Sequence, residues 1–212
     1  MRRAPWILLP LLCVLVSPAR AADDQSEVQY RPPPPERRGD FAVSLTLGSG
    51  LAVAQGSPNE VEKLNDPAFQ QHTGAAFQLG NELWLGAALR DWFVLGFGLA
   101  QRGSHGGPVQ VSTSSFITHL EFYPLFAQGG ALRDLSIYGE FGAGSGKMVR
   151  RGQQVANAGV LSTIATGIVF EPLRWGGFAA GPALQYMHQF SPSLRADFVG
   201  LGFRVAFYAS GN

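Results

Sequence analysis

The stretch Gly139–Lys147, GEFGAGSGK, contains the residue types that cradle a phosphate, with four glycines and a closing lysine. A phosphate-binding P-loop requires the pattern G-x-x-x-x-G-K-[ST]. Phe141 stands five positions before Gly146, where the first glycine is needed, and Met148 replaces the hydroxyl that binds magnesium. The glycine spacing of a dinucleotide-binding fingerprint is also missing. The sequence therefore predicts no nucleotide and no other cofactor at this stretch.

Two further kinds of chemistry depend on histidine. His72, His105, His119 and His188 show no metal-ligand spacing on a shared element, so we predict no metal site. A hydrolase needs a base beside a hydroxyl, with an acid behind the base. His188 and Ser191 lie close together in the sequence, but Asp197 completes such a group only if the intervening loop folds back. We therefore predict no catalytic residues and expect that the protein is not an enzyme.

The first residues predict export. Residues 1–21, MRRAPWILLPLLCVLVSPARA, combine two early arginines, an apolar run too short to span a bilayer, and small residues before a cleavage site. Cleavage removes the only cysteine, Cys13, and three of the 16 Lys and Arg residues. The 13 that remain face 15 Asp and Glu, so the mature chain carries about −2 and no basic block. Nucleic acid is not an expected partner.

The mature chain divides into two parts. Residues 22–39 are polar and contain the run Pro32–Pro35, which favours an extended polyproline II spacer in the periplasm. Residues 40–212 alternate with a period of two, which is typical of half-buried strands. We predict eight strands over residues 40–54, 75–89, 92–102, 110–123, 134–144, 158–170, 177–189 and 197–209.

These segments are about twice as long as ordinary strands, and they match the 9–11 residues that a tilted strand needs to cross a membrane. An even number of such strands predicts an all-β fold, an eight-stranded antiparallel up-and-down transmembrane β-barrel. Long polar connections at residues 55–73 and 145–157 alternate with tight ones such as Arg90-Asp91. We expect Trp92, Tyr123, Trp175 and Tyr186 to form aromatic girdles at the membrane interfaces.

The pattern over residues 40–212 resembles the small eight-stranded outer-membrane barrels, which include outer membrane proteins X and W and the transmembrane domain of outer membrane protein A. The resemblance implies a location in the bacterial outer membrane. It also implies outer-membrane lipids, lipopolysaccharide and the barrel-insertion machinery as partners. Phe207 and Tyr208 lie a few residues inside the C-terminus, whereas these families end on an aromatic residue.

Strand parity predicts which polar side chains face the lumen. We expect a buried network centred on Arg204 and Glu140, with His119 and Glu121 nearby, because buried charges persist only when they are paired. The network either plugs the barrel or forms a gated pore or proton-linked switch. The predicted lumen residues are Glu82, His119, Glu121, Tyr138, Glu140, Gln185 and Arg204.

The function expected from these features is non-enzymatic: a structural role, surface interaction, or a narrow conduit for small apolar molecules. Arg150 and Arg151 are candidates for contact with lipopolysaccharide phosphates. Two alternatives stay open. One is a lipid A-modifying acyl hydrolase or transferase that uses His188, Ser191 and Asp197. The other is a secreted, lipocalin-like binding barrel with its apolar faces inward.

Overall fold

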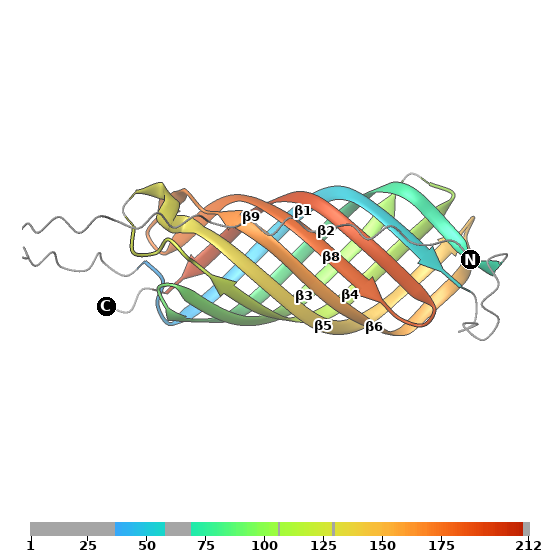
Figure 1. The fold of residues 1–212 in the computed structure, drawn as a ribbon, viewed down its shortest axis with the longest axis horizontal. Helices are drawn as coiled ribbons and strands as arrows, with labels where there is room; N and C mark the ends of the chain where they lie inside the picture. Colours follow the sequence, from blue (N-terminus) through green and yellow to red (C-terminus); the bar gives the residue numbers. More distant parts are fainter. Residues whose placement is uncertain (1–36, 58–68, 106, 129, 210–212) are drawn as a thin grey trace, which may run out of the picture. The chain divides into compact units, whose positions relative to one another are not determined.

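The computed structural model describes residues 37–57, 69–105, 107–128 and 130–209. The predicted signal peptide and nearly all of the proline-rich segment lie outside these residues. Within them, long strands follow one another along the chain (Figure 1). The strands are β1 Phe41–Gly56, β2 Gln71–Arg90, β3 Phe93–His105, β4 Val109–Phe122, β5 Leu135–Arg150, β6 Gln153–Phe170, β8 Phe178–Phe190 and β9 Leu194–Tyr208, with a short β7 at Leu173–Trp175 and the 3₁₀ helix η3 at Ala131–Asp134.

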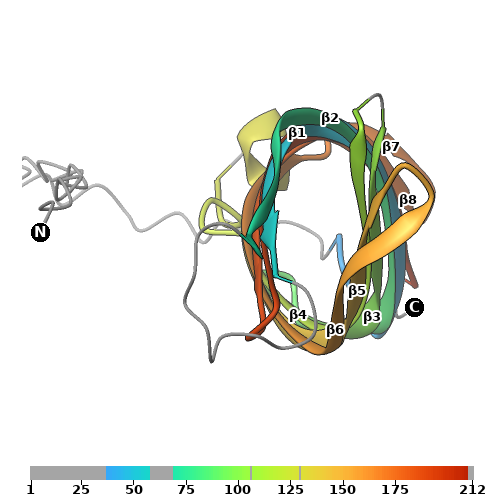
Figure 2. The same cartoon turned by 90° about the vertical axis from the view of Figure 1, so that its right-hand side faces the viewer.

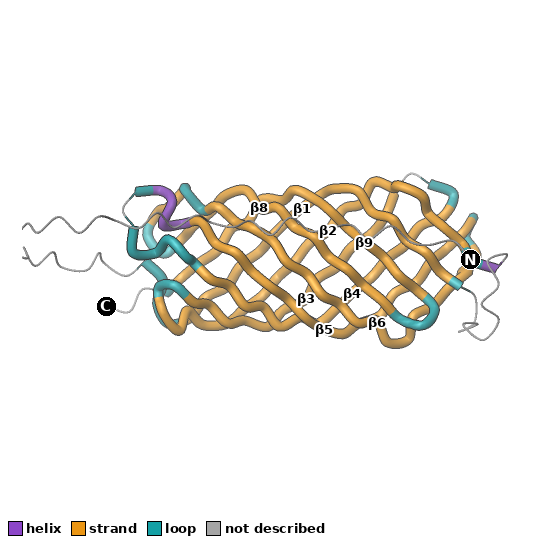
Figure 3. Tube along the Cα trace, in the orientation of Figure 1, coloured by secondary structure: helices purple, strands orange, loops and turns teal. Residues whose placement is uncertain are grey.

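Eight of these strands form a closed ring. Each of β1 to β5 pairs antiparallel with the next strand, β8 pairs with β9, and β9 pairs with β1. Pairing between β6 and β8, from Ser162↔Phe190 to Val169↔Ala183, closes the ring. The ring is visible in Figure 2 and the tilted strands in Figure 3. Within the described ranges, closure leaves no long unpaired strand edge, which is what lipid requires. The predicted fold class is confirmed.

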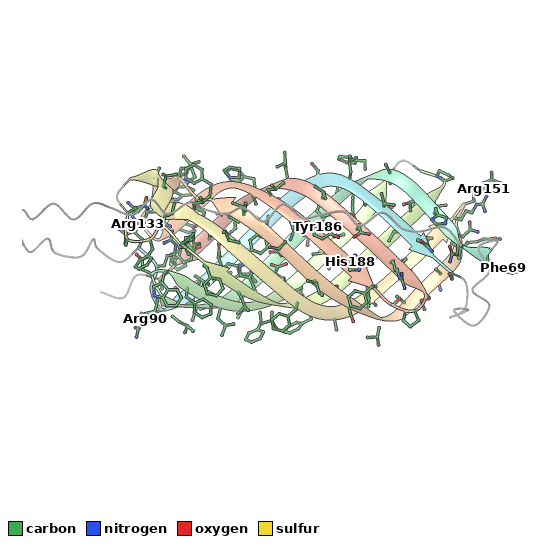
Figure 4. The ribbon with its side chains drawn as sticks, in the orientation of Figure 1. Phe69, Arg90, Arg133, Arg151, Tyr186 and His188 are labelled. Carbon is green, nitrogen blue, oxygen red and sulfur yellow. The ribbon has the colours of Figure 1, made fainter. Side chains whose placement is uncertain are left out.

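The barrel has two ends, which we call the base and the top. The base carries residues 37–40, the turn at Asp91-Trp92, η3 and the end of β9 at Tyr208. The top carries the turns at Arg151-Gly152 and Ser191-Ser193. Arg90 and Arg133 lie at the base and Phe69 and Arg151 at the top in Figure 4.

The predicted long loop at residues 145–157 is wrong. β5 continues to Arg150 and β6 begins at Gln153, so Arg151 and Gly152 form a two-residue turn with φ values of 50° and 84°. Consecutive positive φ values are typical of the tight hairpin turn that matches strand twist. The polar residues that suggested a loop instead belong to strands: Ser145 and Lys147 face outward, and Met148 is buried in the lumen.

The outward face of the barrel is apolar. Large hydrophobic side chains alternate with buried ones along every long strand, and many are about half exposed, for example Leu47, Leu85, Phe116, Phe141 and Leu201. In water this surface would be costly, at about 25 cal/mol per Å² of apolar area, whereas the acyl chains of a bilayer cover it. No helix among the described residues has the length and apolar character to cross a membrane.

The lumen is filled in layers. An apolar cluster that includes Met148, Leu161 and Leu194 packs the top, and a cluster that includes Trp84, Tyr123 and Tyr208 packs the base. Polar and charged side chains lie between them. Glycines allow neighbouring strands of the wall to approach each other closely: a Cβ on Gly142 would come within 2.0 Å of the backbone oxygen of Phe116. In the stretch GEFGAGSGK this glycine serves close packing of β4 and β5, within a continuous strand.

Candidate functional site

The candidate site is the polar layer of the lumen. All seven side chains that strand parity assigned to the lumen are buried, and the structure brings them into two connected groups around His119 and Glu82. They come from β2, β4, β5, β8 and β9, so the polar layer links strands from around the barrel. We describe each group from its contacts.

His119 is the centre of the first group. It faces Glu140 across the β4–β5 ladder, and its Nδ1 lies 2.7 Å from Oε1 of Glu140. Its Nε2 lies 3.3 Å from Oε2 of Glu121. The imidazole is stacked on Trp84, with ring centroids 4.6 Å apart, and on Tyr138 at 5.1 Å. These contacts fix the ring plane, so both nitrogens point at carboxylates.

Arg204 joins this group from β9. It donates through Nη2 to Oε2 of Glu121 at 2.6 Å and to the hydroxyl of Tyr208 at 3.0 Å. It also forms an ion pair with Glu171, with Nε 3.0 Å from Oε1. We expected Arg204 and Glu140 to form the centre of the network. Instead, Glu121 and His119 lie between them, because Arg204 reaches toward the base and Glu140 packs beside its cross-strand neighbour.

Glu82 anchors the second group. Gln185 donates to Oε2 of Glu82 at 2.9 Å, and Nη2 of Arg102 lies 3.5 Å from the same oxygen. Arg102 also donates to the side-chain oxygen of Gln185. Sequence reasoning missed Arg102 because it placed the end of β3 there. The signal was present, since Arg102 has the same parity as the buried Ala100.

A third cluster seals the base and was not predicted. Arg38, which precedes β1, is buried there and donates to Oδ1 of Asp134 at 2.7 Å, while its Nη1 lies 3.4 Å from Oδ1 of Asp91. Further arginines surround the same two carboxylates: Arg133 donates to Asp91, and both Arg37 and Arg174 donate to Asp134. Nothing in the alternation of strands points to these contacts, because they come from turns and from the segment before the barrel.

Burial and charge act against each other in this cluster. Burial disfavours the charged form of Arg38, but the surrounding tyrosines and carboxylates outweigh burial and raise its pKa. Burial raises the pKa of Glu171, and the neighbouring Arg204 opposes that rise. Tyr123 donates a hydrogen bond to Glu171 at 3.3 Å, and burial holds its pKa well above the usual value. The base is therefore a largely buried ionic cluster in which each charge depends on its partners.

The predicted aromatic girdle is partly wrong. Trp92, Trp175 and Tyr186 are exposed on the outer face, where Trp92 stacks with Phe122 and Trp175 with Phe178. Tyr123 is fully buried inside the base, where its hydroxyl lies 2.7 Å from that of Tyr208. The reason is parity: Tyr123 follows β4 in the same inward phase as His119 and Glu121.

The outer wall carries a separate polar group about midway along the barrel (Figure 4). His188 and Asp197 are cross-strand partners on β8 and β9, with Nδ1 2.9 Å from Oδ1, and Tyr186 donates to the same oxygen at 2.7 Å. Tyr186 and His188 are labelled in Figure 4. The strand register alone makes the histidine–acid contact, without the loop folding that the sequence suggested. The hydroxyl of Ser191 interacts with the backbone of Leu194.

No protein-family model matches the sequence, and no curated protein matches it significantly. Among solved structures, Neisserial surface protein A is similar with a TM-score of 0.47 and 11% identity, over 78% of this chain and 96% of that one. Ail, the attachment invasion locus protein of Yersinia pestis, gives 0.47 and 15%, over 78% and 99%. The N-terminal β-barrel domain of Pseudomonas aeruginosa OprF gives 0.42 and 15%, over 79% and 98%.

The closure of the ring and the polarity of its two faces define the class of barrel. The ring of eight long antiparallel strands is closed, its outward face carries an apolar belt, and its interior holds a buried layer of polar and charged side chains. A soluble barrel has the opposite polarity, so the lipocalin-like alternative is wrong. These are the features of the barrels that cross the outer membrane of bacteria. The chain forms a closed eight-stranded antiparallel β-barrel with an apolar outer face, which is the architecture of a membrane-spanning barrel.

Proposed function

We propose that this protein is a sealed structural barrel that presents its top to the cell surface, and that it does not conduct solutes. The observation that carries the proposal is the packing of the lumen. A void near Arg102 and Gln185 has an accessible volume of about 10 Å³, which is at the lower limit for holding one water molecule. Solute passage through the lumen would require buried side chains to move.

Both ends support this proposal. At the top, Met148, Leu161 and Leu194 are buried in an apolar cluster, which offers no hydrogen-bond partners to water. At the base, Arg38 lies between two aspartates and against the ring of Tyr123. Small outer-membrane barrels place their chain termini in the periplasm. In that orientation the base faces the periplasm and the top faces the outside.

The top carries cations that suit the phosphates of lipopolysaccharide. Arg150 is exposed at the end of β5, where it donates to Gln71 at 3.0 Å, and Arg151 occupies the tip of the next turn. Lys147 and Arg195 are also exposed on the outward surface of this half. Guanidinium groups bind phosphate oxygens through paired hydrogen bonds. We therefore assign the lipid-phosphate contacts of the top to these residues.

Conductance in planar bilayers tests the sealed barrel. The full chain, refolded from urea and inserted into lipid, is expected to stay silent, and Glu140→Ala is also expected to stay silent because both seals remain. Replacing Met148 and Leu161 together with glycine removes the top seal, whereas Leu51→Gly removes an outward side chain of similar size and is the control. Stable conductance steps from the unchanged chain would overturn the proposal.

A second candidate function is lipid A modification on the outer wall. It is favoured by the contact between His188 and Asp197, and by a groove of about 480 Å³ that His188, Ser191 and Arg195 line. Against it, the Ser191 hydroxyl is engaged with the backbone of Leu194. Mass spectrometry of lipid A from cells with the protein, without it, and with His188→Ala decides this point. An acyl pattern that changes only with the intact protein would support the enzyme and contradict a purely structural role.

A further inference from the structure

Glu140 differs from the other buried carboxylates of the lumen. Glu82 has Arg102 nearby, and Glu121 and Glu171 both contact Arg204. Among the described residues, the charged partner of Glu140 is His119 alone, through one oxygen. The other oxygen, Oε2, is buried without a hydrogen-bond partner, although the residue is only 2% exposed. A buried carboxylate oxygen without a donor is costly, so its position requires an explanation.

A second carboxylate lies beside it. One oxygen of Glu82, one nitrogen of His119 and one oxygen of Glu140 all lie within 4.8 Å of one another. All three residues are buried, and they come from β2, β4 and β5. Two carboxylates this close in a buried site cannot both stay ionised on their own, so either they share a proton or a cation lies between them. The geometry therefore leaves a place for a cation among three potential ligand atoms.

We propose that Glu82, His119 and Glu140 bind one divalent transition-metal ion of the Zn²⁺ type. One imidazole nitrogen and two carboxylate oxygens form a ligand set that zinc accepts, and the nitrogen favours it over magnesium or calcium. Zinc ligands lie about 2.0–2.2 Å from the ion, so they are at most about 4.4 Å apart. The cluster has to contract by a few tenths of an ångström, which the side-chain torsions of two glutamates allow.

The surroundings of the cluster already resemble the second layer of a metal site. With Nδ1 of His119 on the ion, Nε2 donates its proton to Glu121, which Arg204 and Ser136 hold in place. A carboxylate behind a ligating histidine is the usual arrangement at protein zinc sites. Gln185 orients Glu82 in the same way. The rings of Trp84 and Tyr138 keep the imidazole in its plane.

Such an ion would connect β2 to β4 and β5 across the lumen. Because apolar packing closes the top and ion pairs close the base, the ion would bind while the strands assemble and would exchange slowly afterwards. This gives the proposal a distinctive signature. Metal added during refolding should be retained, whereas metal added to the finished barrel should bind much more slowly.

The test uses the full mature chain, refolded from urea into detergent micelles with Zn²⁺ present and then passed through chelator-containing buffer. We expect about one zinc ion per chain by elemental mass spectrometry, and no retained calcium or magnesium when these replace zinc. Refolding with Co²⁺ should give the visible absorption of cobalt with nitrogen and oxygen ligands. An unchanged chain that retains no zinc and shows no cobalt absorption would overturn the proposal, whatever the variants do.

Matched variants locate the ion. Glu140→Gln and His119→Gln each remove one ligand with little change in volume, and each should lower zinc retention more than tenfold. Glu171→Gln neutralises a buried glutamate outside the cluster and should retain zinc like the unchanged chain. Equal retention by all of these proteins would show an adventitious ion elsewhere and would contradict the site. If a ligand variant does not refold, the cobalt spectrum of the unchanged chain decides.

Discussion

The guanidinium carbon of Arg38 lies 3.4 Å from the centroid of the Tyr123 ring. This contact joins the segment before the first strand to the residue after β4, and it lies inside the base of the barrel. A cation over an aromatic face is most favourable where water is excluded. Two aspartates hold the same guanidinium, so Arg38 fixes the start of the described chain to the base of the barrel.

Replacing Arg38 with alanine should therefore destabilise the barrel. Removing one partner of a buried ion pair costs about 3–5 kcal/mol, and we expect the lower end because Arg133 and Arg37 still contact the two aspartates. Arg90→Ala, an exposed arginine at the same end, should have little effect. The measurement is urea unfolding in micelles, followed by the loss of heat-modifiable migration on a detergent gel. Equal midpoints for the two variants would contradict a structural role for Arg38.

Arg204 should couple strongly to Glu121. Arg204→Met leaves two buried glutamates without their guanidinium and should cost about 3–5 kcal/mol. Glu121→Gln in the same background removes one of the uncompensated charges and should recover part of this loss. A double-mutant cycle from urea midpoints measures the coupling. Strictly additive effects of the two changes would mean that the ion pair contributes no coupling to stability.

The alternation of residues was enough to predict the barrel and the lumen side chains, because a period of two assigns each residue to one face. Glu82, His119 and Arg204 share the inward parity of their strands and are buried in the structure, although they lie far apart in the sequence. Parity also accounts for Tyr123 and Arg102, because each has the same parity as its buried neighbours. Both stood at the end of a predicted strand, where Tyr123 was assigned to the girdle and Arg102 was not assigned to the lumen.

Other features depend on distances that no periodic pattern contains. Whether Glu140 meets Arg204 or His119 follows from strand register and barrel shear, which set the heights of β5 and β9 relative to each other. The contacts of Arg38 with Asp91 and Asp134 join a leading segment to two turns. The turn at Arg151-Gly152 was hidden by polar residues that line strands beyond the apolar belt.

The pH dependence of stability should carry a contribution from Glu171. Its pKa in the folded barrel is raised above the ordinary 4.5, mainly by burial. The folded state therefore holds this proton at pH values where the unfolded chain has lost it, so this contribution is complete below pH 4.5 and is lost as pH rises through the folded pKa. Glu171→Gln should remove that decline. Parallel stability–pH curves for the variant and the unchanged chain would contradict the expectation.

A charge on the outward face should lower the stability of the barrel by an amount that depends on its depth in the bilayer. Phe141 is half exposed midway along β5, and an arginine at such a position costs about 2–4 kcal/mol in lipid. Lys147 lies on the same face of the same strand nearer the top, so Lys147→Ala should change stability by less than about 0.5 kcal/mol. Unfolding from lipid vesicles measures both variants. A tolerated Phe141→Arg would place this part of β5 outside the membrane.

The two glycines Gly139 and Gly142 should respond in opposite ways to the same added methyl group. A Cβ at Gly142 would lie 2.0 Å from the carbonyl oxygen of Phe116, and backbone of a paired strand cannot move aside cheaply. Forcing extra volume into a packed site typically costs about 1–3 kcal/mol, sometimes more. A Cβ at Gly139 meets no atom within 4 Å, and no positive φ constrains it. Gly139→Ala should therefore fold normally or gain slightly in stability from reduced unfolded-state entropy.

Refolding yield and urea midpoint of the two alanine variants provide the comparison. Equal tolerance at both positions would mean that β4 and β5 are less closely packed than their backbone contact indicates.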